Sequence, residues 1–66
     1  MIINLNGRPH ELPDDTTLEA LVETVTGAIR GSAAAVQGAV IPRGDWAGYQ
    51  LVSGCSVELI TAVQGG

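Results

Sequence analysis

The apolar stripe in the first half of the chain constrains the fold more than any other feature of the sequence. It is formed by Leu18, Leu21, Val22 and Val25, and acidic and hydroxyl side chains occupy the other side of the same segment. Apolar residues at this spacing predict an amphipathic helix with one buried face. The helix is therefore expected to lie on a sheet formed by the rest of the chain.

Both ends of this helix are predicted by the sequence. Thr16-Thr17-Leu18-Glu19 fits a capping box, in which the Thr16 side chain caps the helix and Glu19 reaches back to it. An acidic first turn also suits the positive end of the helix dipole. Gly27 is expected to end the helix in the left-handed conformation.

A hairpin is predicted before the helix. Apolar residues alternate with asparagine over residues 1–5, which indicates a strand with one buried face. Asn6-Gly7 is a strong signal for a two-residue hairpin turn, and residues 8–12 form the expected return strand. Because Pro9 has no N–H for a ladder, this strand is placed at a sheet edge.

Three further short strands are predicted after the helix. Residues 33–37, mostly alanine, form the first, and Gln37-Gly38 is interpreted as a second tight turn. Val40 and Ile41 follow, and Pro42 indicates another edge strand. The last strand lies near the end of the chain.

The end of the chain contributes much of the predicted core. Core positions are expected at Leu51, Val57, Leu59 and Val63. Trp46 lies in a glycine-rich segment, and its side chain is expected to close one end of the core as a structural anchor.

Two strands, one helix and three short strands can bury one core only if the helix crosses one face of the sheet. A right-handed connection then places the last strand parallel to the first in the centre of the sheet. The expected fold is α+β, a β-grasp arrangement with a mixed five-strand sheet. Residues 1–66 are expected to form a single domain, with residues 64–66 as a flexible functional tail. The helix is expected to pack on Ile3, Leu5, Val36, Val57 and Leu59.

The charge balance restricts the partners. Seven acidic residues stand against three arginines, which gives a net charge of −4. Nucleic acid and anionic membrane are therefore excluded as expected partners, and a partner with a basic docking surface is favoured. The first residues do not form a signal peptide and no apolar run is long enough to span a membrane, so the cytoplasm is the expected location. Cys55 is the one cysteine, which fits a reducing compartment.

The sequence contains no recognisable catalytic constellation or metal-ligand pattern. His10 is interpreted as a solvated side chain on an edge strand, and Cys55 as a small turn residue. The chain is therefore expected not to be an enzyme, and no bound cofactor or metal is expected.

The terminal Gly65-Gly66 is the strongest functional signal. Residues without a Cβ can pass through a narrow channel and bring the terminal carboxylate to another protein's active site. A carboxylate needs activation before it can act as an acyl donor, so an ATP-dependent partner is implied. On the last strand, Ile60 and Ala62 are expected to form an exposed apolar spot for docking.

Two blocks of sequence carry a family resemblance. Residues 35–43 read Ala-Val-Gln-Gly-Ala-Val-Ile-Pro-Arg and are followed by Trp46, and residues 57–66 end in Val-Gln-Gly-Gly. With these blocks the chain resembles, over essentially its whole length, the ThiS family of ubiquitin-like sulfur carriers of thiamin biosynthesis. It departs from the family pattern at residues 53–56, where an acidic Asp-Gly-Asp turn is usual, and at Gln37, where Asn is usual.

The resemblance implies a covalent site at Gly66, with Gln64 and Gly65 recognised as part of the tail. It implies that a ThiF-type enzyme uses ATP to adenylate the Gly66 carboxylate, and that sulfur from a persulfide donor converts it to a thiocarboxylate. A ThiG-type thiazole synthase would then accept the sulfur. The free carrier is expected to be a monomer.

Three alternatives remain open at this point. A MoaD-like sulfur carrier for molybdopterin synthesis has similar tail chemistry, although such chains are usually longer and richer in aromatic residues. A ubiquitin-like protein modifier needs the same adenylation but forms isopeptide products. A plain binding module has an inert tail, and deletion of Gly66 distinguishes it from the carriers.

Overall fold

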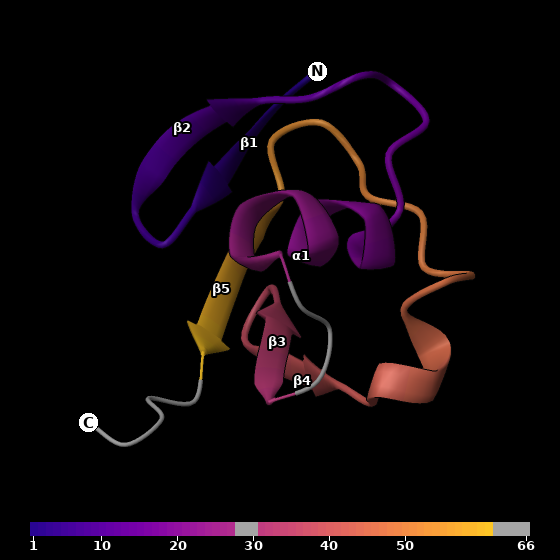
Figure 1. Ribbon diagram of the computed structural model, residues 1–66. Helices are drawn as coiled ribbons and strands as arrows, with labels where there is room; N and C mark the ends of the chain where they lie inside the picture. The colour runs from indigo at the N-terminus through magenta and orange to yellow at the C-terminus, as the bar shows by residue number, and fades with distance from the viewer. Residues whose placement is uncertain (28–30, 62–66) are drawn as a thin grey trace.

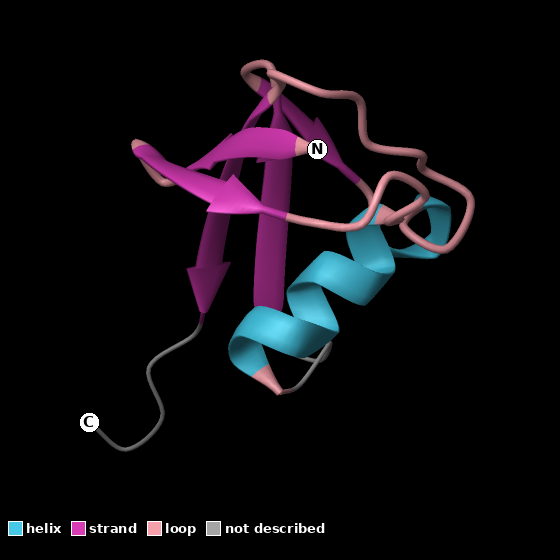
Figure 2. Ribbon diagram, turned by 90° about the horizontal axis from the view of Figure 1, so that it is seen from above, coloured by secondary structure: helices cyan, strands magenta, loops and turns pink. Residues whose placement is uncertain are grey.

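The computed structural model describes residues 1–27 and 31–61, which form one sheet with a helix across one face (Figures 1 and 2). The strands are β1 (Ile2–Leu5), β2 (Arg8–Glu11), β3 (Ser32–Val36), β4 (Ala39–Ile41) and β5 (Ser56–Thr61); the helix is α1 (Leu18–Thr26), and a 3-10 turn, η1, spans Arg43–Asp45. The strand order is β2-β1-β5-β3-β4. Strand β5 runs parallel to β1 and antiparallel to β3, so the predicted β-grasp fold is confirmed.

The two hairpin turns have the same backbone conformation. Asn6 and Gly7 have φ values of 51° and 84°, and Gln37 and Gly38 have values of 52° and 83°. Two consecutive left-handed residues match the twist of the flanking strands, as in type I′ turns. Both predicted turns are confirmed.

The prolines lie at or next to the sheet edges, as predicted. Pro9 lies opposite Asn4 in the outer strand β2. In a two-residue hairpin this pair does not exchange hydrogen bonds, so an N–H at position 9 would point out of the sheet. The opposite edge is β4, and Pro42 follows it directly.

The core lies between α1 and the sheet. The buried apolar residues are Ile3, Leu12, Leu18, Leu21, Val22, Ala34, Val36, Trp46, Leu51, Cys55, Val57 and Leu59. Three members of the predicted helix stripe are thus fully buried. Val25 is 43% exposed, and its assignment to the core was wrong.

Helical geometry explains the exposure of Val25. At 3.6 residues per turn, Val25 points to the same side of α1 as Leu18 and Leu21, so the helix is not rotated away from its expected face. Val25 instead lies in the last turn, next to the left-handed cap Gly27, where the packed layer ends. Leu5, at the hairpin end of β1, is similarly only partly buried against the core.

The helix begins one residue later than the capping box predicted. Thr17, not Thr16, is the N-cap, and its side chain accepts a hydrogen bond from the Ala20 N–H at 3.2 Å. The Thr16 hydroxyl donates to the Pro13 carbonyl, and the Thr16 carbonyl accepts from the Leu51 N–H. These contacts hold Thr16 outside the helix.

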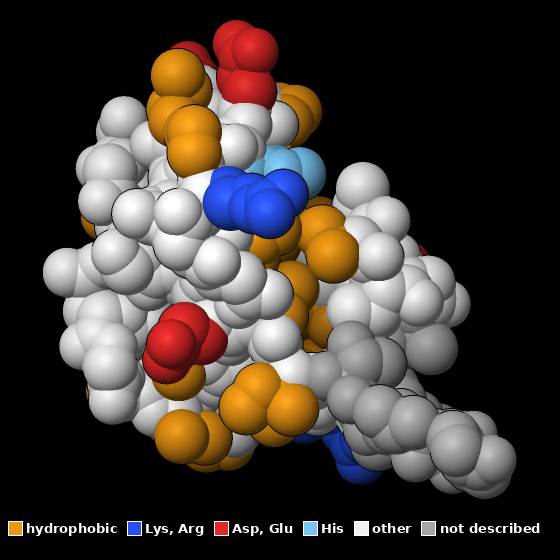
Figure 3. Space-filling view, turned by 90° about the vertical axis from the view of Figure 1, so that its left-hand side faces the viewer, with side chains coloured by type: hydrophobic (Ala, Val, Ile, Leu, Met, Phe, Trp, Pro, Cys, Tyr) orange, Lys and Arg blue, Asp and Glu red, His pale blue; other side chains and the backbone are white. Residues whose placement is uncertain are grey.

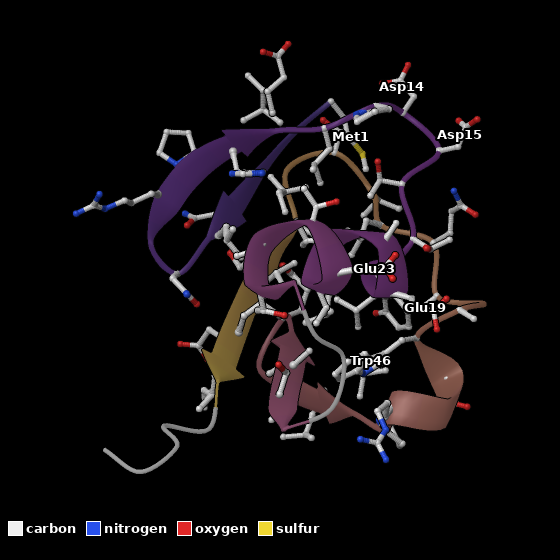
Figure 4. All side chains as sticks on the ribbon, in the orientation of Figure 1. Met1, Asp14, Asp15, Glu19, Glu23 and Trp46 are labelled. Atoms are coloured by element: carbon white, nitrogen blue, oxygen red, sulfur yellow. The ribbon has the colours of Figure 1, made fainter. Side chains whose placement is uncertain are left out.

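The turn around Trp46 satisfies the other free N–H groups at the start of α1. The Leu18 N–H donates to the Tyr49 carbonyl at 2.9 Å, and the Glu19 N–H donates to the Trp46 carbonyl at 3.2 Å. The Trp46 indole is 1% exposed, and its N–H donates to the Ile41 carbonyl at 2.8 Å. Figure 4 shows Trp46 directed from this turn to the underside of α1. The predicted anchor role of Trp46 is confirmed.

Leu21→Ala is predicted to lower the free energy of unfolding by about 2 to 5 kcal/mol, because it leaves a cavity under α1. Val25→Ala makes a similar truncation on an exposed residue of the same helix and should cost less than about 1 kcal/mol. Urea denaturation of the two variants measures the difference. Equal losses would contradict the orientation of α1.

Candidate functional site

The candidate site begins where the described chain ends, on β5. The predicted covalent residue Gly66, the recognition residues Gln64 and Gly65, and the docking residue Ala62 lie outside the described residues. Ile60, the other residue predicted to take part in docking, lies in β5 and is 68% exposed. The described part of the candidate site therefore consists of β5 and the surface around Ile60.

Strand β5 is held from both sides. On the β1 side, the Asn4 N–H donates to the Cys55 carbonyl at 2.8 Å. On the β3 side, the register runs from Val36 opposite Val57 to Ser32 opposite Thr61. Because strand side chains alternate, Val57 and Leu59 are buried while Glu58 and Ile60 point to the open face.

Two side-chain amides add to this support. The Asn6 amide accepts from the Leu59 N–H at 2.9 Å and donates to the Leu59 carbonyl at 3.3 Å. On the other side of the strand, the Gln37 side chain accepts from the Ser56 N–H at 2.5 Å, and the Gln37 N–H donates to the Ser56 carbonyl at 2.8 Å. The first residue of each hairpin turn thus acts as a further pairing group for β5. These contacts were missed by the sequence analysis, which interpreted both residues only as turn signals.

The face of the sheet opposite α1 carries a shallow groove of about 200 Å³. Ala33 and Ala35 of β3 form its floor, Val40 of β4 lies on one side, and Ile60 and Glu58 of β5 lie on the other. The small side chains of β3 create the hollow because bulkier side chains stand on both neighbouring strands. We call this surface the β3 groove.

The β3 groove is largely apolar and exposed. Val40 is 76% exposed and Ile60 is 68% exposed, and Glu58 supplies its charged group. Figure 3 shows apolar side chains exposed at the end of the sheet where β5 finishes. The predicted apolar spot thus includes Ile60 and extends to Val40, which the sequence analysis had treated only as part of an edge strand. The signal available in the sequence was the continuous run of small residues in β3, Ser-Ala-Ala-Ala.

Other acidic side chains lie away from the groove. Asp14, Asp15, Glu19 and Glu23 lie on the loop before α1 and on α1, on the other side of the sheet (Figure 4). The Met1 ammonium contacts Asp14 at 3.0 Å. Glu58 is the acidic residue among those that line the groove.

The possible metal ligands among the described residues lie apart from one another. No group of three or more His, Cys, Asp or Glu side chains in residues 1–27 and 31–61 could hold a metal ion. His10 is half-buried in β2, opposite Ile3. Cys55 is 4% exposed and belongs to the core, so its interpretation as a simple turn residue was incomplete. In the part of the chain that the structure describes, no helix has both the length and the apolar character needed to cross a membrane.

The fold and the last two residues of the sequence together define the class of protein. A β-grasp sheet whose central strand precedes a C-terminal Gly65-Gly66 is the architecture of a ubiquitin-like protein. The ThiS family model matches residues 3–66, and the chain belongs to the ThiS family. Membership supports a role as a small sulfur carrier that is not itself a catalyst.

Solved structures support the fold independently. The crystal structure of a thiamine biosynthesis protein (ThiS) from Geobacter metallireducens has a TM-score of 0.82 and 21% identity, with 100% of both chains covered. The NMR solution structure of a thiamine biosynthesis protein from the same organism has a TM-score of 0.84 and 20% identity, covering 100% of this chain and 88% of that one. No curated protein sequence matches the chain.

Asn6→Asp is predicted to lower the free energy of unfolding by about 1 to 3 kcal/mol, because a carboxylate oxygen replaces the amide that donates to the Leu59 carbonyl. Asn4→Asp introduces the same charge on an exposed side chain of β1 and is the matched control. Thermal and urea denaturation should show a loss only for the Asn6 variant. A similar loss in both variants would assign the effect to charge rather than to the contact with β5.

Proposed function

We propose that this protein carries sulfur as a thiocarboxylate at Gly66 and donates it for thiazole formation in thiamin biosynthesis. The observation that carries the proposal is the match of the ThiS family model through residue 66, which includes the terminal Gly65-Gly66. The shared fold with thiamine biosynthesis proteins of Geobacter metallireducens supports it.

In this proposal a ThiF-type enzyme transfers AMP from ATP to the Gly66 carboxylate, and pyrophosphate leaves. The terminal sulfur of a persulfide then attacks the activated carbonyl carbon, AMP leaves, and an acyl disulfide forms. A thiol reductant cleaves the S–S bond of this disulfide and releases the thiocarboxylate. A ThiG-type thiazole synthase accepts the sulfur. Attachment to a protein keeps the sulfur at high effective concentration in the synthase without free sulfide.

The chain itself contributes presentation rather than catalysis. Five residues follow Thr61 and span at most about 17 Å when extended, so the reactive carboxylate stays close to the folded domain. Gln64 and Gly65 precede it and are proposed to be recognised in the partner's channel. The sheet fixes where this segment starts, because β5 is paired on both sides up to Leu59.

The β3 groove is proposed to dock the partner enzymes. Ile60 and Val40 provide exposed apolar contacts, Ala62 follows on the same segment, and Glu58 suits a basic side chain on the partner. A partner seated there lies within the reach of the tail. The core of a protein interface is usually apolar and its rim polar, which is the arrangement that these residues offer.

Deletion of Gly66 is predicted to abolish adenylation and leave the melting temperature unchanged. The deletion moves the carboxylate back by about 3.3 Å, which is more than a reaction centre tolerates. ATP–pyrophosphate exchange with a ThiF-type enzyme, thiazole formation with a ThiG-type enzyme and thermal melting measure the three properties. Full activity of the deleted chain would contradict every carrier function, and rescue of molybdopterin synthesis in place of thiazole formation would favour a MoaD-like carrier.

Ile60→Asp is predicted to weaken binding to the adenylating enzyme by about tenfold or more, because it places a charge in the β3 groove. Val52→Asp is the matched control. Val52 is also a β-branched aliphatic residue, and it is 65% exposed, but it does not line the groove. Calorimetric titration measures both affinities, and unchanged melting temperatures show that both variants fold. Equal weakening would exclude the groove as the specific docking surface.

A further inference from the structure

The end of β5 extends beyond the β1–β2 hairpin, and one side of the strand is left open there. Thr61 lies opposite Ser32 of β3, whereas the β1 register ends where Leu5 lies opposite Val57. Figure 1 shows β5 continuing past the hairpin turn. Within the described residues, β5 therefore ends with a neighbouring strand on its β3 side only.

The hydrogen bonds show which main-chain groups point to the open side. The Val57 carbonyl accepts from the Asn6 N–H at 2.9 Å, and both main-chain groups of Leu59 bind the Asn6 amide. Main-chain groups of alternate strand residues point to the same side. The N–H and carbonyl of Thr61 therefore point to the β1 side, one step beyond the last contact of Asn6, and no described residue pairs with them there.

We propose that this side of Thr61 is a strand-addition site for an extended segment of the adenylating enzyme. The inference rests on the proposed function, because that enzyme must hold a chain that ends five residues after Thr61. Main-chain pairing holds an extended chain without selecting its side chains. Asn6 occupies the pairing groups of Leu59 and so fixes the position at which an added strand begins.

The short distance to the chain end identifies the enzyme as the occupant. Five extended residues span at most about 17 Å, so a segment paired with Thr61 lies next to the site that receives the carboxylate. The β3 groove is a separate surface, formed by side chains on the open face rather than by main-chain groups at a strand edge. The two surfaces together restrain both the position of the domain and the direction of its last strand.

A backbone ester at Thr61 tests the inference. Total chemical synthesis of the 66-residue chain can replace this one N–H by oxygen and retain the side chain. The matched control is an ester at Val40 in the edge strand β4. Val40 lies opposite Ala35, which also pairs with Glu58 of β5, so the Val40 N–H points out of the sheet at its other edge.

Both esters are expected to melt alike and slightly below the unmodified chain, because the ester carbonyls of Ile60 and Ala39 accept hydrogen bonds from β3 more weakly than amide carbonyls. The Thr61 ester should bind the adenylating enzyme about threefold to tenfold more weakly in calorimetric titration, which corresponds to one lost hydrogen bond. The Val40 ester should bind with unchanged affinity.

Several results would overturn the inference. One is an unchanged affinity of the Thr61 ester for the enzyme, and another is an equal loss of affinity in both esters. A third is a lowered melting temperature of the Thr61 ester alone, because this result would place the Thr61 N–H in a contact within the chain. A dimer of the unmodified chain that the Thr61 ester disrupts, with enzyme binding unaffected, would identify a second copy as the occupant. If the unmodified chain supports no ATP–pyrophosphate exchange, the proposed function itself fails, whereas normal exchange with an unaffected ester removes only the strand-addition site.

Discussion

The pairing of β5 on both sides is the interaction on which the rest of the structure depends. A parallel pair between the first and last strands requires a long crossover, and α1, β3, β4 and the turn around Trp46 all lie within it. Buried main-chain groups without partners are costly, so both sides of β5 need pairing groups along its length. The short strand β1 and the β3 turn supply too few of these groups, and the amides of Asn6 and Gln37 provide partners for Leu59 and Ser56.

The start of the helix also depends on hydrogen bonds from a short neighbouring segment. Its first N–H groups are satisfied by Thr17 and by carbonyls of the turn at Trp46 and Tyr49, so the turn and the helix position each other. The buried indole of Trp46 then links this turn back to Ile41 at the end of β4. A chain with few aromatic residues thereby closes one end of its core with a single large side chain.

Division of the sheet into two faces separates stability from recognition. The face under α1 contains the buried apolar residues, whereas the other carries the β3 groove and Glu58. The proposed function uses this arrangement, because in it the chain presents its end and a docking surface while the proposed partners supply the chemistry. Gln37, at the position where the resemblance led us to expect asparagine, accepts a hydrogen bond from the Ser56 N–H through its side-chain amide.

The sequence by itself determined the periodic and turn-forming features: the helix stripe, the two left-handed turns, the edge position of Pro9 and the anchor Trp46. These follow from local chemistry, in which glycine permits positive φ, proline lacks an N–H and alternating apolar residues need one buried face. Only the tertiary structure decided that Val25 lies outside the packed layer, that Thr17 caps α1 and that Cys55 is buried. The same holds for the amide contacts of Asn6 and for the β3 groove, because each joins residues from strands that are distant in the sequence. Local patterns cannot specify such contacts, since they depend on how the strands are ordered and where each one ends.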